Sequence, residues 1–359
     1  MSELYDISIF NFSGDTLAIG NAEGETFKHP LNELIKKRLD HTCHYKKVGL
    51  KKLKKQLMSR VESNWTLLKR YDSIAFQKTN AIVKASNVNL EEYLISASVT
   101  DFRDEEFDPE GCTSIVFNTS KMGLMGAQTW DLAEENMPYV IMIHEKPDHG
   151  IERWTMNCYG FPPLMGMNIY GLSIGTTNLK TRDIGDGLGY VQLIDHALNY
   201  KSARLAVKQF KSLPRLASHT YWVVDPQEGF QLDTGHEFFQ SFCYNEEALV
   251  KTNHPTPLPL QKKQLAQPSL SSLMRKKQAE LLFQLEPANI NDIKEYLADR
   301  SHGIESISRL SEDGTGITSN SCFIAQPRQR KIWACRGPAQ LGIWKSFNFE
   351  ETYDKKESA

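Results

Sequence analysis

The spacing of apolar residues separates a helical first part of the chain from a strand-rich second part. Between residues 30 and 100, apolar residues recur every three or four positions, as in Leu31, Leu34, Ile35 and Leu39. This spacing places apolar side chains on one face of an α-helix. The pattern therefore predicts a largely helical region over residues 30–100.

Two short segments border this helical region. Residues 4–20 alternate between apolar and polar positions on either side of Ser13-Gly14-Asp15, which predicts a β-hairpin with its turn at those three residues. Residues 102–110 are acidic and contain Pro109, which indicates an exposed loop. Such a loop suits a site at which a chain is processed.

After residue 111 the pattern favours strands. The runs expected to form strands are 113–118, 122–129, 138–145, 152–159, 166–178, 219–224, 229–234, 237–243, 248–252, 320–325 and 331–335. Helices are expected at 190–212, 270–285 and 291–299. Helices, then many strands, then further helices predict an α+β fold in which helices cover β-sheets.

Composition narrows the class of protein. The 359 residues carry a net charge of -2, which gives no overall reason to expect nucleic acid or an anionic membrane as a partner. No apolar run approaches the roughly 18 residues of a membrane span. The six cysteines are dispersed and form no CxxC pair, which indicates reduced thiols and a cytoplasmic location. No recurring pattern of metal ligands is present, so neither metal nor cofactor is expected.

The junction Gly111-Cys112-Thr113 is the strongest candidate for chemistry. It opens a strand-like run, and Asp131 follows nineteen residues after the cysteine at the end of the next run. If the peptide bond before Cys112 breaks, Cys112 gains an α-amine, whose pKa near ~8 suits a general base. One residue then supplies both nucleophile and base. Glycine suits the attacked position because it tolerates strained dihedral angles.

Several motifs, in the same order, resemble the isopenicillin N acyltransferase family. They are Gly111-Cys112-Thr113, the run from Gly126 to Asp131, the strand-turn-strand from Gly166 to Asn178, Lys251-Thr252-Asn253-His254, and Ser272 with Arg275 at a helix start. That family also contains carcinine and β-alanyl-amine hydrolases and belongs to the N-terminal nucleophile (Ntn) hydrolases, alongside the choloylglycine hydrolases. The resemblance covers nearly the whole chain.

The resemblance implies a four-layer αββα sandwich made as a precursor and cut before Cys112. The pieces, a largely helical 1–111 and a catalytic 112–359, are expected to stay together as a heterodimer within one domain. No cofactor is implied, and the higher oligomeric state, including a homo-oligomer, is left open. One position departs from the family: Leu132 follows Asp131, where relatives often carry an aromatic residue.

Two further catalytic residues follow from these motifs. Asp131 is the best candidate to orient the α-amine of Cys112, although a strand-end carboxylate in a turn is the plainer interpretation. Asn253 is the best oxyanion donor, because its amide N–H groups can be aimed at a developing negative charge. Asparagine before His254-Pro255 is also an ordinary turn former.

Other motif residues have less specific roles. Thr113 and Gln128 are expected to shape the pocket or to hydrogen-bond the amine, or else to be simple strand residues. Asn178 is expected to line the same site. Arg275 is suited to a bidentate contact with a substrate carboxylate, although a solvated arginine at a helix start is an equal alternative. The mechanism leaves no role for His254, which is expected to be structural.

The predicted function is a cofactor-free N-terminal cysteine amidohydrolase or acyltransferase. Its substrate is expected to be a small N-acyl or β-alanyl-type amide, cleaved through an acyl-enzyme on Cys112. Three alternatives remain open: acyl transfer from acyl-CoA to an amine, a pseudoenzyme scaffold that never cuts itself, and a helical adaptor that uses the lysine-rich residues 36–55.

Overall fold

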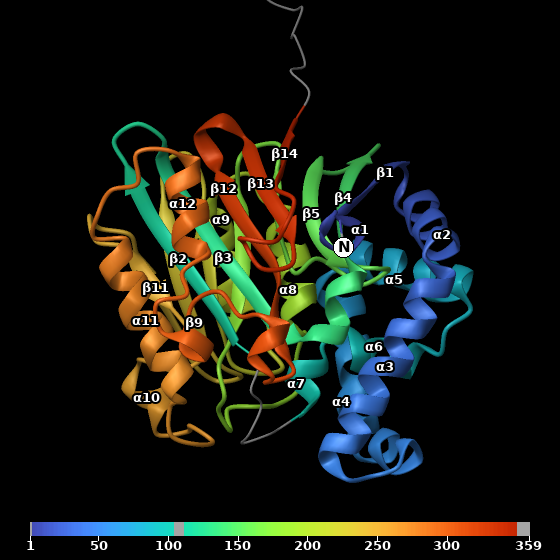
Figure 1. Cartoon of the computed structure of the whole chain (residues 1–359). Coiled ribbons are helices and arrows are strands. Elements are labelled where there is room, and N and C mark those ends of the chain that lie inside the picture. The colour runs from blue at the N-terminus through green and yellow to red at the C-terminus, as the bar shows by residue number, and fades with distance from the viewer. Residues whose placement is uncertain (1, 104–110, 350–359) are drawn as a thin grey trace, which may run out of the picture.

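The computed structural model describes residues 2–103 and 111–349, and two β-sheets form its centre (Figure 1). The larger sheet has eight strands: β1 (Ser8–Gly14), β4 (Val140–Pro147), β5 (Arg153–Cys158), β6 (Met165–Asn168), β7 (Ser173–Asn178), β8 (His219–Val224), β9 (Gly229–Thr234) and β10 (Phe239–Cys243), in that order across the sheet. β1 and β4 are parallel, and the other neighbouring pairs of this sheet are antiparallel.

The smaller sheet has six antiparallel strands. Across this sheet they are β11 (Leu249–Lys251), β2 (Gly111–Thr119), β3 (Gly123–Ala133), β12 (Ile317–Gln326), β13 (Lys331–Arg336) and β14 (Lys345–Asn348). The neighbouring strands β2 and β3 carry the Gly-Cys junction and the motif that ends in Asp131. Cys112 and Asp131 therefore lie on adjacent strands of this sheet.

The two sheets pack face to face around the indole ring of Trp222 on β8. A Cβ atom added to Gly126 on β3 would collide with this ring, and one added to Gly175 on β7 would lie 2.5 Å from its Nε1 atom. The Trp222 Nε1–H donates a hydrogen bond across the interface to Oε1 of Gln128 on β3 at 2.6 Å. Two glycines thus leave the space that a large ring fills between the sheets.

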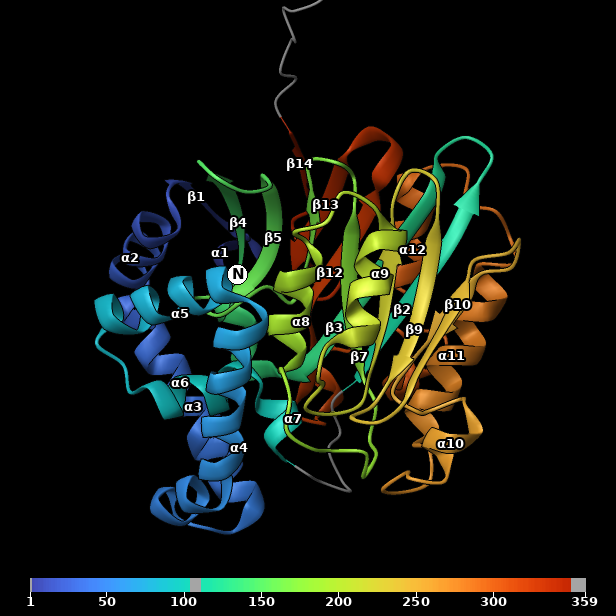
Figure 2. The ribbon, with the colours of Figure 1, turned by 180° about the vertical axis from the view of Figure 1, so that it is seen from behind.

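Helices cover both outer faces of the sheet pair. The helices are α1 (Ser2–Tyr5), α2 (Thr16–Thr26), α3 (Lys28–Lys46), α4 (Leu50–Tyr71), α5 (Ser73–Ser86), α6 (Leu90–Ala97), α7 (Val99–Arg103), α8 (Tyr190–Ala197), α9 (Ala203–Ser212), α10 (Leu258–Gln261), α11 (Leu270–Leu282) and α12 (Ile290–Leu297), with short 3-10 helices at Glu134–Tyr139, Gly303–Glu305, Ser311–Asp313 and Pro327–Gln329. α8 and α9 contact the larger sheet, and α11 contacts β2 and β11 of the smaller one (Figure 2). These layers confirm the predicted αββα sandwich.

The helical prediction for residues 30–100 is confirmed, since α3, α4, α5 and α6 fill this region. None of the helices in the described parts of the chain combines the length and the apolar character that crossing a bilayer requires. The division into pieces 1–111 and 112–359 remains a prediction.

The predicted hairpin over residues 4–20 is wrong. Its first half forms β1, but β1 pairs in parallel with β4 from the second part of the chain. Its second half is helix α2, which begins after Asp15. The Asp15 side chain accepts a hydrogen bond from the backbone N–H of Ala18 at 2.8 Å. Residues that resemble a hairpin turn therefore act as a helix cap.

The single helix predicted over residues 190–212 is two helices. The side-chain amide of Asn168 donates to the backbone carbonyls of Leu198 at 2.9 Å and of Tyr200 at 2.7 Å, where α8 has ended. Ser202 then caps α9 by accepting from the N–H of Leu205. Asn168 from β6 thus satisfies carbonyls at the end of α8, and Ser202 is a local helix-start signal that the prediction of one helix overlooked.

The other predictions after residue 111 are confirmed to within a few residues, including the helix capped by Asn289. The run 166–178 contains β6 and β7, joined by a turn with Gly171 at φ +82°. No pattern predicts β14. Phe102, expected in an exposed loop, is buried at the end of α7. The remainder of that loop, 104–110, lies outside the described residues.

A buried charge network joins the helical first part to the larger sheet. Lys78 on α5 lies 2.8 Å from Glu23 on α2 and 2.6 Å from Glu145 on β4. Arg153 on β5 bridges Glu145 at 3.0 Å and Asp195 on α8 at 2.7 Å. Three carboxylates thus face two cations. Burial raises the pKa of Glu23 to about 7. Burial has the same effect on Glu145, but Arg153 and Lys78 outweigh it and hold that pKa at about 2.

This network predicts a stability change across neutral pH. The pKa of Glu23 is higher in the folded chain than its ordinary value of 4.5. The contribution of this group to folding is therefore complete below pH 4.5 and is lost as the pH rises through 7. Between pH 5 and 8 we expect the free energy of unfolding of wild type to fall by about 1–3 kcal/mol relative to that of E23Q. The Tm of wild type should fall accordingly.

Thermal unfolding of E23Q and wild type at several pH values measures this difference. E25Q, which alters an exposed carboxylate on the same helix, is the matched control and should follow wild type. Parallel pH profiles for wild type and E23Q would show that Glu23 does not titrate in this range.

Candidate active site

Cys112 lies at the head of β2, on the face that packs toward the larger sheet. Its cross-strand partner is Trp130 on β3. Both line a pocket with about 390 Å³ of empty space, part of it open to solvent. The other lining residues are Val99, Thr100, Gly111, Asp131, Leu132, Thr176, Asn178, Tyr190, His219 and Asn253. The pocket therefore opens onto the candidate nucleophile.

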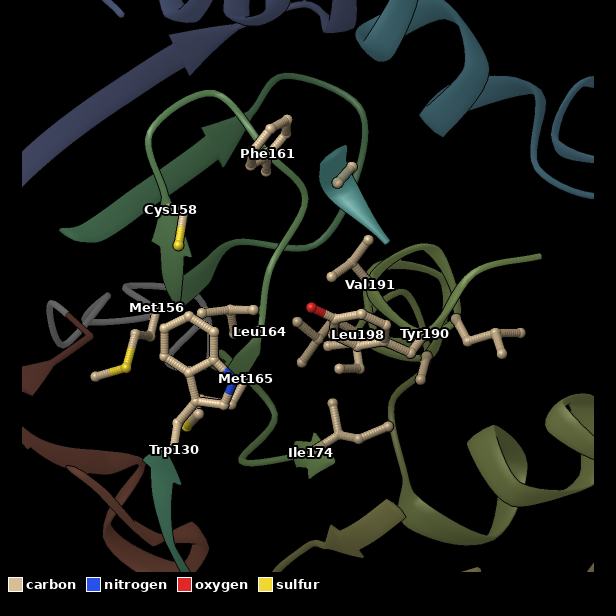
Figure 3. Close-up of a cluster of buried hydrophobic side chains, with 14 of the residues drawn as sticks. Trp130, Met156, Cys158, Phe161, Leu164, Met165, Ile174, Tyr190, Val191 and Leu198 are labelled. Atoms are coloured by element: carbon tan, nitrogen blue, oxygen red, sulfur yellow. The ribbon is translucent and has the colours of Figure 1, made fainter. Parts of the chain in front are cut away.

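Two residues of the pocket wall, Trp130 and Tyr190, belong to a cluster of buried apolar side chains. Figure 3 shows Trp130 on one side and Tyr190 and Leu198 of the α8 region on the other, with Met165 and Ile174 of the larger sheet between them. All five are buried. This packing fixes the two lining aromatic residues, because close-packed side chains leave each other few alternative rotamers.

Gly111 is the cross-strand partner of Asp131. A side chain at position 111 would have no room, because Arg275 lies close to the backbone there. That this position also needs the dihedral tolerance of glycine stays a prediction. A Cβ atom at Gly111 would lie 2.8 Å from Nη2 of Arg275 and 3.4 Å from Oδ2 of Asp131. The close approach of the guanidinium excludes a larger residue.

Asn253 connects the nucleophile to two other segments. Its Oδ1 accepts hydrogen bonds from the backbone N–H of Cys112 at 2.9 Å and from Nη2 of Arg275 at 2.8 Å. Its Nδ2 donates to the backbone carbonyl of Asn178 at 3.1 Å, and its backbone N–H donates to Oγ of Ser272 at 3.0 Å. Two donors facing Oδ1 determine which way the side-chain amide is turned.

Arg275 on α11 is 1% exposed, so the alternative of a solvated arginine is wrong. Its Nη1 donates to the backbone carbonyl of Cys112 and, at 3.1 Å, to Oγ1 of Thr113. Its Nε donates to Oγ of Ser271 at 3.1 Å. Its Nη2 donates to Oδ1 of Asn253. The guanidinium thus donates to acceptors of the protein itself and not to a substrate carboxylate. Arg275 therefore holds the backbone of the nucleophile from the helix-covered side of the sheet.

Asp131 is a buried carboxylate beside the start of β2. Its Oδ1 accepts a hydrogen bond from Oγ of Ser319 at 2.7 Å, and its Oδ2 has no hydrogen-bond partner among the described residues. Burial raises the pKa of Asp131 to about 6, although the charges of Arg275 and Arg309 act in the opposite direction. An acceptor oxygen is thus available next to the end of the chain that a cut before Cys112 creates.

Thr113 and Gln128 support the site from outside the pocket wall. Both are completely buried, and Thr113 meets Arg275 on the face opposite the pocket. Gln128 lies between the sheets, where its Nε2 donates to the backbone carbonyl of Thr176 at 2.5 Å and its Oε1 accepts from Trp222. Gln128 therefore reaches the pocket only through Thr176, which lines it.

His254 is tied into the packing behind the site. Its Nδ1 lies 2.8 Å from Oγ of Ser272 and 3.2 Å from Oγ1 of Thr252. Burial, together with nearby cations such as Lys276, lowers its pKa to about 4, so the ring is neutral at pH 7. This agrees with a structural role. Across residues 2–103 and 111–349, no three His, Cys, Asp or Glu side chains are grouped so as to hold a metal ion.

Sequence reasoning missed five residues of the pocket wall: Val99, Thr100, Thr176, Tyr190 and His219. They come from the end of the helical part, two strands and the start of α8. No local motif joins them, because only the fold brings these segments together. The acidic run after Val99 and Thr100 pointed to a processing loop but not to the wall that precedes it.

Two solved structures resemble this one weakly. A mutant conjugated bile acid hydrolase from Clostridium perfringens has 10% sequence identity and a TM-score of 0.36, covering 67% of this chain and 98% of its own. Penicillin V acylase from Agrobacterium tumefaciens has 10% identity and a TM-score of 0.37, covering 62% of this chain and 82% of its own. TM-scores this low do not establish a shared fold, so the αββα assignment depends on the sheets and helices themselves. No curated protein sequence matches the chain significantly.

The family is established by the sequence of the second part. The family model described as acyl-coenzyme A:6-aminopenicillanic acid acyl-transferase matches residues 119–340, more than half of the chain. The match contains Asp131, Asn253 and Arg275 and begins seven residues after Cys112. The chain therefore belongs to the acyl-coenzyme A:6-aminopenicillanic acid acyltransferase family, which confirms the acyltransferase resemblance of its sequence.

Proposed function

We propose that this protein is a self-processing amidohydrolase or acyltransferase that forms its acyl-enzyme on Cys112. One observation carries the proposal: Cys112 heads β2 in the pocket wall, with its backbone nitrogen bonded to Asn253 and its carbonyl to Arg275. Of the six cysteines, Cys112 is the one that lines this pocket. Because the family match begins after Cys112, the assignment of the nucleophile depends on this geometry.

Self-cleavage is the first step. The Cys112 thiol attacks the carbonyl carbon of Gly111, a sulfur–carbon bond forms, and the peptide carbon–nitrogen bond breaks. The departing nitrogen takes a proton and becomes the α-amine of Cys112. Water then hydrolyses the thioester, which leaves a carboxylate on Gly111 and restores the thiol. Hydrogen bonds to the backbone on both sides of the Cys112 α-carbon support this step, because they fix the backbone during the attack.

Turnover uses the same sulfur. The α-amine accepts the thiol proton, and the thiolate attacks the carbonyl carbon of a substrate amide or thioester. The leaving amine or thiol takes the proton, and an acyl-thioester remains on Cys112. Water completes hydrolysis, whereas an amine acceptor completes transfer. The acceptor that enters the pocket thus decides between the two reactions.

Asn253 holds the nucleophile and stabilises the oxyanion. Its Oδ1 accepts from the nitrogen of Cys112, which keeps that nitrogen in place as a base. One hydrogen of Nδ2 is bonded to the carbonyl of Asn178, and the second is the donor that we assign to the developing negative charge. One such donor contributes roughly 3 kcal/mol to the transition state.

Asp131 orients the α-amine. Its Oδ2 is a buried acceptor without a partner in the described structure, and it lies close to Gly111. Once the chain is cut, the N–H groups of the amine provide partners for such an acceptor. A carboxylate with a pKa of about 6 is mostly ionised at pH 7 and can serve in this way.

The proposed substrate is a small N-acyl or β-alanyl-type amide. The narrow, mainly apolar pocket supports a small acyl group. Acyl transfer from acyl-CoA is the second candidate, and the name of the family favours it. Activity of the purified protein against a panel of N-acyl amides, with and without acyl-CoA and an amine acceptor, separates the two reactions.

The first prediction concerns Cys112. In C112A we expect an intact chain and no turnover, because both steps need the sulfur. In C112S we expect slow or incomplete cutting, because a hydroxyl is the weaker nucleophile. Intact-mass spectrometry and N-terminal sequencing measure the cut.

C243A removes an exposed cysteine and is the matched control, with cutting and turnover expected to equal those of wild type. A wild-type protein that stays whole, with no chain beginning at Cys112, would instead support the pseudoenzyme scaffold. Normal turnover by C112A contradicts the proposed mechanism.

The second prediction concerns the oxyanion. N253A should lower kcat by about 10²–10³ with a smaller change in KM, because the donor acts mainly in the transition state. Steady-state kinetics on the processed protein measures both constants. A loss confined to KM would assign Asn253 to substrate binding alone.

The third prediction concerns pH. Protonation of Asp131 removes the acceptor of the α-amine, so kcat/KM should decline below a midpoint near pH 6. S319A removes a hydrogen bond that favours the ionised carboxylate and should move this midpoint to higher pH. If kcat/KM declines at the same pH in S319A and in wild type, a group other than Asp131 controls the decline.

A further inference from the structure

The chain segment before the proposed cut forms part of the pocket wall. Val99 and Thr100, on α7, line the same pocket as Cys112. α7 has five residues, so it forms few hydrogen bonds of its own. Contacts with the second part of the chain must therefore hold these two residues in place.

Asp101 supplies such contacts from the middle of α7. Its Oδ1 lies 2.5 Å from Nε2 of His219 on β8, and its Oδ2 accepts from the backbone N–H of Tyr190, the first residue of α8, at 2.9 Å. Asp101 is 1% exposed and His219 is 2% exposed. A buried carboxylate with both of its oxygens hydrogen-bonded to the second part of the chain is a specific attachment, because each bond requires one geometry.

His219 is occupied on both ring nitrogens. Its Nδ1 lies 3.4 Å from Oγ1 of Thr176, and its ring stacks on Tyr190 with centroids 4.9 Å apart and an interplanar angle of 25°. Thr176, Tyr190 and His219 all line the pocket. His219 is therefore placed to position the wall, and it has no nitrogen available as a catalytic base.

We propose that Asp101 and His219 form a clamp that holds Val99 and Thr100 against the pocket, so that fragment 1–111 determines which acyl group the enzyme accepts. The inference rests on the proposed function. Val99 lines the pocket together with Trp130, Leu132 and Tyr190, and these apolar side chains suit a short, uncharged acyl group. Asp101 and His219 are positioning residues, because they act through the wall.

The molecule contains a matched pair elsewhere. Asp72 bonds Nδ1 of His196 on α8 at 2.7 Å and also caps α5 through the N–H of Ala75. This pair, too, joins the first part of the chain to the second. Neither residue lines the pocket. D72N therefore removes the same type of charge as D101N, at the same type of boundary, without altering the wall.

The first experiment measures access to the nucleophile. Cys112 is alkylated with iodoacetamide in wild type, D101N and D72N, and its modification is followed by peptide mass spectrometry. D101N should raise the rate at Cys112 by about threefold to tenfold, because a released wall opens the pocket more often. D72N should leave the rate near that of wild type. Equal rates in D101N and D72N would overturn the clamp.

The second experiment measures acyl-group selectivity on processed protein with N-acetyl, N-butanoyl and N-hexanoyl amides. D101N and V99A should raise KM for the shortest substrate by about tenfold and shift preference toward longer chains, because both enlarge the space around the acyl group. Their kcat should change less than KM, and D72N should keep the wild-type order. V99A leaves the buried pair intact and so tests the wall if D101N folds poorly.

The two experiments separate the clamp from the proposed function. If wild type neither cuts itself nor turns over any amide, the proposed function fails, whereas alkylation of Cys112 still decides whether the clamp exists. If turnover is present but V99A and D101N keep the wild-type chain-length preference, fragment 1–111 does not determine selectivity and the inference fails.

Discussion

The buried guanidinium of Arg275 is the interaction on which the site depends. An arginine removed from water is costly unless its N–H groups find acceptors and its charge finds a partner. Here the backbone of Cys112, the side chains of Thr113 and Asn253, and the nearby charge of Asp131 meet both needs.

This requirement explains the neighbouring sequence. The guanidinium approaches β2 so closely that position 111 has no room for a Cβ atom. Asn253 must present its oxygen to both Arg275 and Cys112, which leaves its nitrogen for other acceptors. One side chain thus fixes helix α11, strand β2 and the loop that carries Asn253 relative to one another.

The sequence predicted most of the helices and strands, and its motifs contain several residues that line the pocket. The failures have physical causes. Residues whose chemistry shows in a local motif, such as Cys112, Asp131 and Asn253, could be recognised along the chain. His219 and Asp101 could not, because they meet only through the fold. The hairpin and the long helix failed where the outcome depended on Asp15 as a cap or on Asn168 reaching across from another strand.

The packing of Trp222 against Gly126 and Gly175 constrains how these three positions can change among related proteins. The indole ring occupies the space of two absent side chains, so none of the three positions can change independently. A larger residue at either glycine requires a smaller one in place of tryptophan. Among homologues these positions should covary, and their joint identity should report how far apart the two sheets lie.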